Sequence, residues 1–513
     1  MATEEAEQIS RKLEKANELR LSGNPIKAVT LLQNARKRWP KNANILTDLA
    51  TCYACIPEFK KAEKCLHQLL ERFPKNKEVL LFAAELQSSM RQLNTSLATY
   101  EQATKLHPDS APAWMKAAEI HERQNRLEDS RECLERALQL DPKSEMARFQ
   151  EAVLLTREKR FEEASQSLCD LLQSGLNDRE VHWKAGHQLA MVMDKMGEFE
   201  SAAQVWLASK EGMEANYAPE IKKAREEFEK KASLIRKLTT ELTSARLESW
   251  KAQGAGSLQP RILAGHPRSG TTLLETMLDR HSMLVSLEET TCMENEIFHA
   301  VFGSHAAETE LFDARFLDRL SSFTFRQAGK HYQKSARQFL GEQSEDVTLL
   351  DKNPMLTHFL GVALRFFPEL KSLVMIRDPR DVCLSCFQQG VGVVTTNVPW
   401  LRVEDTMKAY RDIMGVWIKV RDLIPEQGLE VRYEDLVKNP ETEARKAVEF
   451  LGLSWEEQTL EPQQEGRTIF SPTYADAAKP VYQSAVRRWD NYENILGPHL
   501  PLLHDAMREF GYS

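Results

Sequence analysis

The chain has 513 residues, more than a single hydrophobic core usually supports, so we expect at least two domains. Its composition, 42% hydrophobic and 28% charged, is typical of globular proteins, and a net charge of −8 provides no general attraction for nucleic acid. The acidic start MATEEAEQIS lacks a secretory signal, and no apolar run approaches the about 18 residues that a membrane span needs. We therefore expect a cytoplasmic protein that has no membrane span, does not bind nucleic acid, and holds any anionic ligand with a local basic cluster.

The eight cysteines are scattered, which is typical of proteins in a reducing compartment. Two pairs have CxxC spacing, Cys52 with Cys55 and Cys383 with Cys386, but both lie within helical patterns. Neither pair has a second pair or histidines at the spacing of a zinc site. We expect buried small side chains at these positions and no metal.

The first half of the chain repeats with a period of 34 residues. Three registers keep this step: the prolines Pro40, Pro74, Pro108 and Pro142; the small residues Ala28, Ala62, Ser96, Ser130 and Ala164; and Phe59, Leu93, Leu127 and Phe161. Each unit has the pattern of two amphipathic helices, with the small residue at a close crossing and the proline after the second helix. The pattern resembles the tetratricopeptide repeat and predicts an all-α solenoid over residues 8–217.

The last repeat departs from this period. Phe199 and Ala202 come 38 residues after Phe161 and Ala164, which indicates an insertion of four residues. Residues 218–257 are predicted to form a long charged helix, at 218–250, followed by a linker. The cluster QGAGSLQP at 253–260 contains several helix-breaking residues and marks the predicted domain boundary.

Short apolar runs then alternate with helical stretches, at 262–265, 347–350, 372–376 and 429–433. This alternation predicts that residues 258–513 form an α/β domain with a parallel sheet, whose ligands bind at the carboxyl edge of the strands. The separate periodicities predict that a fragment of residues 218–513 folds on its own.

The first of these strands leads directly into GHPRSGTTLL. Gly265 and Gly270 have the GxxxxG spacing of a P-loop, which directs backbone N–H groups and a helix N-terminus at an anion. In nucleotide triphosphatases the second glycine precedes a lysine, but here Thr271 follows, and the positive charge comes from Arg268. The missing lysine disfavours a P-loop kinase or triphosphatase.

PRSGTTLL resembles the 5′-phosphosulfate loop of sulfotransferases that use 3′-phosphoadenosine-5′-phosphosulfate (PAPS). VMIRDPRDVCLSCF, with Arg377 eight residues before Ser385, resembles their 3′-phosphate site. VRYEDLV places Tyr433 where the family stacks an aromatic ring near adenine, although a buried strand residue is an equal alternative. KPVYQSAVRRW resembles the closing segment, whose basic residue before tryptophan, Arg488 here with Arg487 beside it, reaches the 3′-phosphate.

Two further motifs resemble the tyrosylprotein branch of this family. Its Glu-Glu-Thr sequence corresponds to HSMLVSLEETT, and the second glutamate, Glu289, follows Arg268 by the family's 21 residues. Its Lys-Asp-Pro sequence corresponds to LLDKNP, which makes Lys352 the residue that contacts the sulfuryl group. The resemblance implies Glu289 as the base, and three alternatives stay open: Glu288, His266 and His281.

The resemblance covers about residues 258–500 and implies a sulfotransferase that moves a sulfuryl group from PAPS to a hydroxyl acceptor by in-line transfer. The product of the donor is adenosine 3′,5′-bisphosphate, and no metal is expected. The implied catalytic residues are Glu289, Lys352 and Arg268. The implied donor-binding residues are Arg268, Ser269, Gly270, Thr271, Thr272, Arg377, Ser385, Tyr433 and Arg488.

The sequence leaves the acceptor open. In the tyrosylprotein branch, arginines after Glu-Glu-Thr contact acidic residues around the target tyrosine, but Thr291 and Asn295 occupy these positions here. The acceptor classes are therefore a protein or peptide tyrosine, a glycan, a lipid or a small alcohol. The repeats have three open roles: docking a polymeric acceptor, forming a homo-oligomer, or supporting the catalytic domain. The rival functions are a P-loop kinase and an inactive repeat scaffold.

Overall fold

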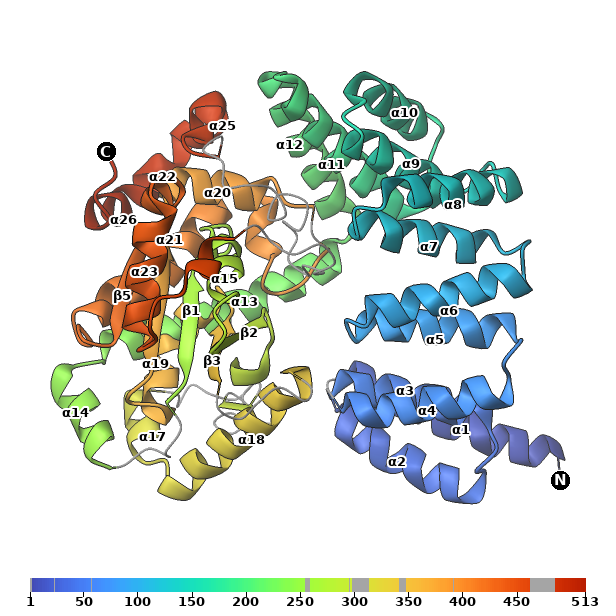
Figure 1. Ribbon diagram of the computed structural model, residues 1–513, viewed down its shortest axis with the longest axis horizontal. Coiled ribbons are helices and arrows are strands. Elements are labelled where there is room, and N and C mark those ends of the chain that lie inside the picture. Colours follow the sequence, from blue (N-terminus) through green and yellow to red (C-terminus); the bar gives the residue numbers. More distant parts are fainter. Residues whose placement is uncertain are drawn as a thin grey trace. The chain divides into compact units, whose positions relative to one another are not determined.

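The computed structural model describes the chain except residues 1, 23, 57, 254–258, 295, 298–312, 341–346, 391 and 462–484. The described chain divides into two compact units, Met1–Arg160 and Phe161–Ser513 (Figure 1). This division at residue 160 differs from the domain boundary predicted near residue 257, which marks the change in sequence pattern. The predicted boundary stays a prediction. The helical repeats followed by a parallel α/β domain confirm the predicted fold class.

The first unit consists of paired helices: α1 Ala2–Leu21, α2 Pro25–Arg38, α3 Ala43–Cys55, α4 Phe59–Arg72, α5 Lys77–Ser89, α6 Leu93–Leu106, α7 Ala111–Arg123, α8 Leu127–Leu140 and α9 Glu145–Arg157. Each repeat proline lies two residues after a helix end. Small residues fill the helix crossings as predicted: Ala28, Ala62, Ser96 and Ser130 are fully buried. Ser96 and Ser130 also donate hydrogen bonds to the carbonyls of Ala84 and Ala118 in the preceding helix.

The second unit begins with the last repeat helices, α10 Phe161–Gln173, α11 Arg179–Met196 and α12 Phe199–Asn216. Helix α11 has 18 residues, against 13 in α9, the equivalent helix of the preceding repeat, and this extra length contains the predicted insertion. The predicted long helix forms two helices, α13 Ala218–Thr240 and α14 Ser244–Ala252. The chain turns between them because the Thr243 hydroxyl caps α14 by accepting the N–H of Arg246. Apolar residues of α13, including Ile221, Phe228 and Ile235, are buried in the unit.

The sheet has five parallel strands in the order β2-β3-β1-β4-β5. They are β1 Arg261–Gly265, β2 Leu284–Glu288, β3 Thr348–Lys352, β4 Lys371–Ile376 and β5 Gly428–Arg432. Four of them were predicted, but β2 was not. It is an edge strand in which only Leu284 and Leu287 are buried, so it lacks the continuous apolar run of a central parallel strand.

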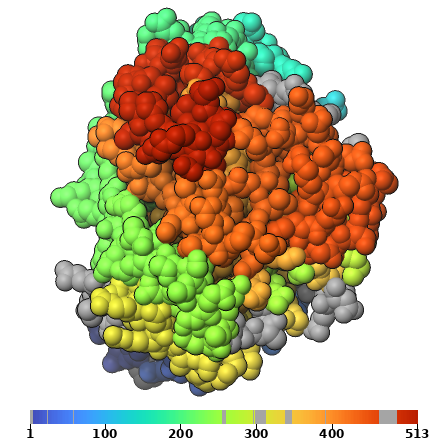
Figure 2. Space-filling model, turned by 90° about the vertical axis from the view of Figure 1, so that its left-hand side faces the viewer, coloured from blue at the N-terminus to red at the C-terminus, as the bar shows by residue number. Residues whose placement is uncertain are grey.

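The α-helices of this domain are α15 Thr271–Leu278, α17 Ala314–Asp318, α18 Ser322–Leu340, α19 Leu356–Phe366, α20 Pro379–Phe387, α21 Val403–Arg421, α22 Tyr433–Lys438, α23 Pro440–Phe450, α25 Glu493–Leu496 and α26 His504–Glu509. Short 3₁₀ helices are η2 Val398–Leu401, η3 Glu457–Leu460, η4 Arg488–Tyr492 and η5 Gly497–Leu503. Alternate residues of β4 face two cores, with Val374 in a core shared with α19 to α21 and Leu373 in a core shared with α15, α22 and α23. Figure 2 shows the C-terminal residues, in red, lying over the orange surface, where η5 and α26 pack on α21.

In the described part of the chain, no helix combines the length and apolar character needed to cross a membrane, and no cluster of three or more His, Cys, Asp and Glu side chains could hold a metal. Cys52, Cys383 and Cys386 are buried, as expected, but Cys55 is exposed because it lies at the end of α3, facing away from the repeat core.

Candidate functional site

The loop from Gly265 to Gly270 connects β1 with α15 at the carboxyl edge of the sheet, as predicted. Both glycines are required by geometry. Gly265 has a φ of +145°, and a Cβ there would lie 2.7 Å from the carbonyl oxygen of Met375. Gly270 has a φ of +102°, and its Cβ would lie 2.5 Å from Cδ2 of Tyr433. The loop thus turns tightly against β4 and the start of α22 and directs the N-terminus of α15 towards the sheet edge.

The residues predicted for the two phosphate sites meet at this loop. Nε of Arg268 donates to Oγ of Ser385 at 3.0 Å, and Nη1 of Arg377 donates to the carbonyl of Arg268 at 3.0 Å. The Arg377 guanidinium also lies 4.7 Å from the centre of the Tyr433 ring. Residues that follow β1, β4 and β5, together with α20, therefore form one basic cluster.

Two polar atoms of this cluster, Oγ of Ser269 and Nε of Arg377, make no hydrogen bond to the described part of the chain. Both atoms are buried, since Ser269 is 1% and Arg377 8% exposed. Buried polar groups normally have partners, so such atoms at a basic loop fit an anion. Thr271 and Thr272 begin α15 beside them and are also buried. These residues fit the two phosphates of PAPS.

Tyr433 is buried, and its observed contacts are with the protein. Its ring supports Arg377 on one side and closely approaches Gly270. The alternative weighed from the sequence was a buried strand residue; Tyr433 is buried, but it is the first residue of α22 and follows the strand. Stacking against adenine stays a prediction.

Lys352 and Glu289 form an ion pair at the carboxyl end of β3. Lys352 ends β3 with its side chain fully buried, and Nζ lies 2.7 Å from Oε1 of Glu289. The Glu289 side chain is 34% exposed, so solvent and an acceptor have access to it. Glu289 has a φ of +46°, a strained value for a residue with a side chain, and its N–H donates to the Lys352 carbonyl.

Glu275 is a third member of this group that the sequence reasoning missed. Its Oε2 lies 3.5 Å from Nζ of Lys352, and its Oε1 accepts the hydroxyl of Ser286. It is 1% exposed in α15. The signal was a single acidic residue in the otherwise uncharged helix TTLLETML, because an isolated charge in an apolar segment needs a buried partner.

The alternative bases are placed differently. His281 lies before β2, and both of its ring nitrogens have structural partners, the carbonyl of Ser454 and the N–H of Met283. His266 is buried in the loop, where Nδ1–H donates to the Pro267 carbonyl, and burial lowers its pKa to about 4. Glu288 ends β2 opposite Lys352 in the parallel register and is partly exposed.

Arg488 lies next to the basic cluster but contacts a carboxylate of the last repeat. Its Nη2 lies 2.5 and 2.7 Å from the two oxygens of Asp194 on α11. The neighbouring backbone is held at Asp381 of α20, which accepts the N–H groups of Arg487 and Trp489. Asp194 could not be foreseen from the sequence because its partner is 294 residues away. The first part of the predicted closing motif, residues 479–484, lies outside the described residues.

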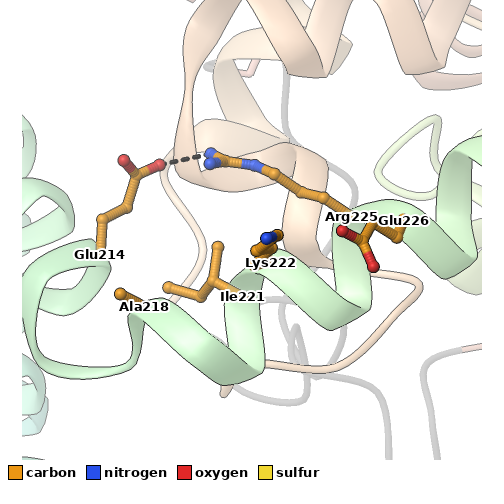
Figure 3. A pocket seen from close by; sticks show the side chains of 6 residues that line it. All are labelled: Glu214, Ala218, Ile221, Lys222, Arg225 and Glu226. Carbon is orange, nitrogen blue, oxygen red and sulfur yellow. Dashed lines mark hydrogen bonds and ion pairs between the residues drawn. The ribbon is translucent and has the colours of Figure 1, made fainter.

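A hollow of about 320 Å³ lies elsewhere, at the junction of α12 and α13. It is lined by Glu214, Ala218, Ile221, Lys222, Arg225 and Glu226 (Figure 3). Glu214 bridges Arg225 and Arg402 at its rim. None of the predicted site residues lines it, so it is separate from the basic cluster.

The chain was compared with known proteins. Residues 260–457 match the sulfotransferase family, and residues 19–86, 83–145 and 122–174 match tetratricopeptide repeats. An uncharacterized protein of Aquifex aeolicus is 27% identical over 67% of this chain and 44% of its own length. Protein-tyrosine sulfotransferase 2 of Gallus gallus is 26% identical over 44% of this chain and 62% of its own length.

The chain thus spans less than two thirds of the length of both relatives. Among solved structures, the sulfotransferase domain of the Synechococcus PCC 7002 olefin synthase aligns with 51% of this chain and 97% of its own length, at 20% identity and a TM-score of 0.37. The family matches lead to one conclusion: residues 260–457 are a sulfotransferase-family domain, and tetratricopeptide repeats precede it.

Proposed function

We propose that the protein transfers a sulfuryl group from PAPS to a hydroxyl acceptor and releases adenosine 3′,5′-bisphosphate. The observation that carries this proposal is the cluster in which Arg268 and Arg377 come together beside buried polar atoms that have no hydrogen-bond partner among the described residues. Two arginines on separate strand ends suit a ligand with two phosphates, because a guanidinium binds phosphate oxygens with paired hydrogen bonds.

In this proposal, Arg268, Ser269, Thr271, Thr272 and the N–H groups beside Gly270 hold the 5′-phosphosulfate. Arg377 and Ser385 hold the 3′-phosphate, which distinguishes PAPS from adenylyl sulfate. Arg488 adds positive charge beside the 3′-phosphate. Tyr433 lies nearest to the proposed adenine position.

Glu289 and Lys352 perform the chemistry in this proposal. Glu289 accepts the proton of the acceptor hydroxyl, and the freed oxygen forms a bond to sulfur. The bond between sulfur and the 5′-phosphate oxygen breaks, and its electron pair stays on that oxygen. Lys352 stabilises the resulting negative charge, while Glu275 holds its ammonium group in place. The accessibility of Glu289 supports its role as the base that faces the acceptor, and in this proposal Lys352 faces the donor.

A hydroxyl of a protein or peptide tyrosine is the acceptor that we propose first. The names of relatives such as the protein-tyrosine sulfotransferases of Gallus gallus and Drosophila melanogaster support it. Thr291 in place of an arginine leaves glycans, lipids and small alcohols as alternatives, and Asn295 lies outside the described residues. The repeats offer a surface for docking a polymeric acceptor. The cytoplasmic location and any homo-oligomer remain predictions.

Calorimetry tests the donor. We expect adenosine 3′,5′-bisphosphate to bind at least about tenfold more tightly than AMP, because the 3′-phosphate adds charge-assisted hydrogen bonds of about 1.5–3 kcal/mol each. Equal affinities would refute PAPS as the donor. Tight ATP binding and magnesium-dependent hydrolysis would instead support the P-loop kinase or triphosphatase.

A transfer assay tests the acceptor. Cell lysate is incubated with the protein and PAPS carrying labelled sulfur, and the products are separated into protein, lipid and small-molecule fractions. Label in tyrosine of the protein fraction supports the first proposal. Label confined to another fraction rejects it in favour of that class, and the absence of label in every fraction supports the inactive scaffold.

A further inference from the structure

Two helices of the last repeat, α11 and α12, contact the segment of residues 485–492 that carries Arg488. All of these elements belong to the second compact unit. We infer that Asp194 on α11 is a positioning residue that orients Arg488 towards the donor's 3′-phosphate. This inference rests on the proposed function, because it requires a donor with a 3′-phosphate.

Asp194 contacts the Arg488 guanidinium through one of its three nitrogens, Nη2. Both carboxylate oxygens of Asp194 contact Nη2, at 2.5 and 2.7 Å. The Asp194 side chain is 4% exposed, whereas the Arg488 side chain is 31% exposed. Within the described residues, the hydrogen bonds of the Arg488 side chain go to Asp194 through this one nitrogen. Nη1 and Nε therefore remain for a second anion.

Asp194 itself is firmly placed. The hydroxyl of Tyr492 donates to its Oδ1 at 2.6 Å. The Tyr492 ring is fully buried and packs against Phe199 and Trp206 of α12, with ring centres 5.7 and 5.8 Å apart. The repeat helices thus fix the carboxylate from several directions, and the carboxylate fixes Arg488.

The backbone on either side of Arg488 is held beside the proposed 3′-phosphate site. Arg377 donates to the Ala485 carbonyl at 2.6 Å. Asp381, four residues after Arg377 and four before Ser385, accepts the N–H groups of Arg487 and Trp489 at 2.8 and 2.9 Å. The segment is thus anchored to the helix that carries Ser385, so Arg488 starts from a position adjacent to both residues.

A flexible arginine loses conformational freedom when it binds a phosphate, and holding it beforehand reduces that cost. A buried ion pair is by itself weak evidence for stability, because desolvation offsets the attraction. Orientation of Arg488 explains why a buried carboxylate lies next to a cation of the donor site. The opposite role, in which Asp194 competes with the phosphate for Arg488, predicts tighter donor binding when the carboxylate is removed.

The test measures binding of adenosine 3′,5′-bisphosphate and AMP by calorimetry in the full chain and its variants. We expect Asp194→Asn to weaken bisphosphate binding about 3- to 10-fold and to leave AMP binding unchanged. Arg488→Ala should weaken bisphosphate binding by about tenfold or more. The double variant should be no weaker than Arg488→Ala alone, because Asp194 acts through Arg488. Glu180→Gln removes an exposed acid of the same helix and should change neither affinity.

The ratio of the two affinities separates positioning from general damage. A wild-type protein that does not prefer the bisphosphate refutes the proposed function itself. If the preference exists, the inference is overturned by three results: equal losses for both nucleotides, tighter bisphosphate binding in Asp194→Asn, or full additivity with Arg488→Ala. Should Asp194→Asn fail to fold, Tyr492→Phe removes one hydroxyl only and should shift the ratio in the same direction by a smaller factor. An unchanged ratio in Tyr492→Phe then rejects the inference.

Discussion

The helix crossings of the repeats and the carboxyl edge of the sheet both bury polar groups, but of different kinds. At the crossings, Ser96 and Ser130 are neutral, and each makes one hydrogen bond to the neighbouring helix. At the sheet edge, Lys352, Glu275 and Arg377 are charged and buried. A buried charge costs several kcal/mol unless it is paired, so a fold does not gather charges at one edge for packing alone. The contrast separates residues that maintain the fold from residues that act on a ligand.

The largest expected effect tests the chemistry at the sheet edge. Glu289→Gln keeps the shape of the side chain but removes the proton acceptor, so the transfer rate should fall by about 10²–10⁴. Bisphosphate affinity should stay the same because Glu289 faces the acceptor. The matched control is Glu288→Gln, which should retain activity. Full turnover in Glu289→Gln with loss in Glu288→Gln would show that the base is misassigned.

The second prediction concerns where the catalytic unit begins. Residues 161–513 should fold and bind the bisphosphate like the full chain, because α11 and α12 share their core with the α/β domain. A fragment of residues 218–513 should aggregate or lose binding, since it lacks Trp206, which is fully buried, and Lys210, which donates to the Trp400 carbonyl. Size exclusion shows whether each fragment aggregates, and calorimetry measures whether it binds the bisphosphate. Normal binding by the shorter fragment would support the boundary expected from the sequence alone.

A third prediction uses pH. Burial raises the pKa of Asp351 to about 7, and the Tyr332 hydroxyl donates to its Oδ2. The folded protein therefore binds this proton more tightly than the unfolded chain, whose aspartate titrates near 4. This residue makes folding less favourable as pH rises from about 4 to 7. Asp351→Asn should remove this loss of stability at high pH. The variant should therefore melt at a higher temperature than the wild type at pH 8, but not at pH 4. Identical pH dependence of the two proteins would contradict the raised pKa.

The smallest effect is expected at the helix crossings. Ala62→Leu should destabilise the repeats by about 1–3 kcal/mol, because Ala62 is fully buried between helices and extra volume forces them apart. Ser130→Ala removes one hydrogen bond at the equivalent position and should cost about 1 kcal/mol. Denaturant unfolding gives both values. If either variant altered bisphosphate affinity, the crossings would have a role in the donor site that the account does not give them.

Much of this architecture was predictable because it follows local patterns. The 34-residue step determined the repeat helices and their small residues, and the glycine spacing located the loop after β1. The edge strand β2 was missed because partial burial removes the apolar run. The break between α13 and α14 was missed because one threonine cap causes it. Glu275 and Asp194 were missed because their roles depend on partners distant in the chain.

The central claim is that Arg268 and Arg377 bind different phosphates of one donor, and paired calorimetry of their alanine variants tests it most directly. Arg377→Ala should weaken adenosine 3′,5′-bisphosphate binding by about tenfold or more and leave AMP unchanged, because AMP lacks the 3′-phosphate. Arg268→Ala should weaken both nucleotides by similar factors. Arg445→Ala, which removes an exposed arginine that pairs with Glu441 on α23, should change neither affinity. Equal losses of AMP and bisphosphate in Arg377→Ala would contradict the account.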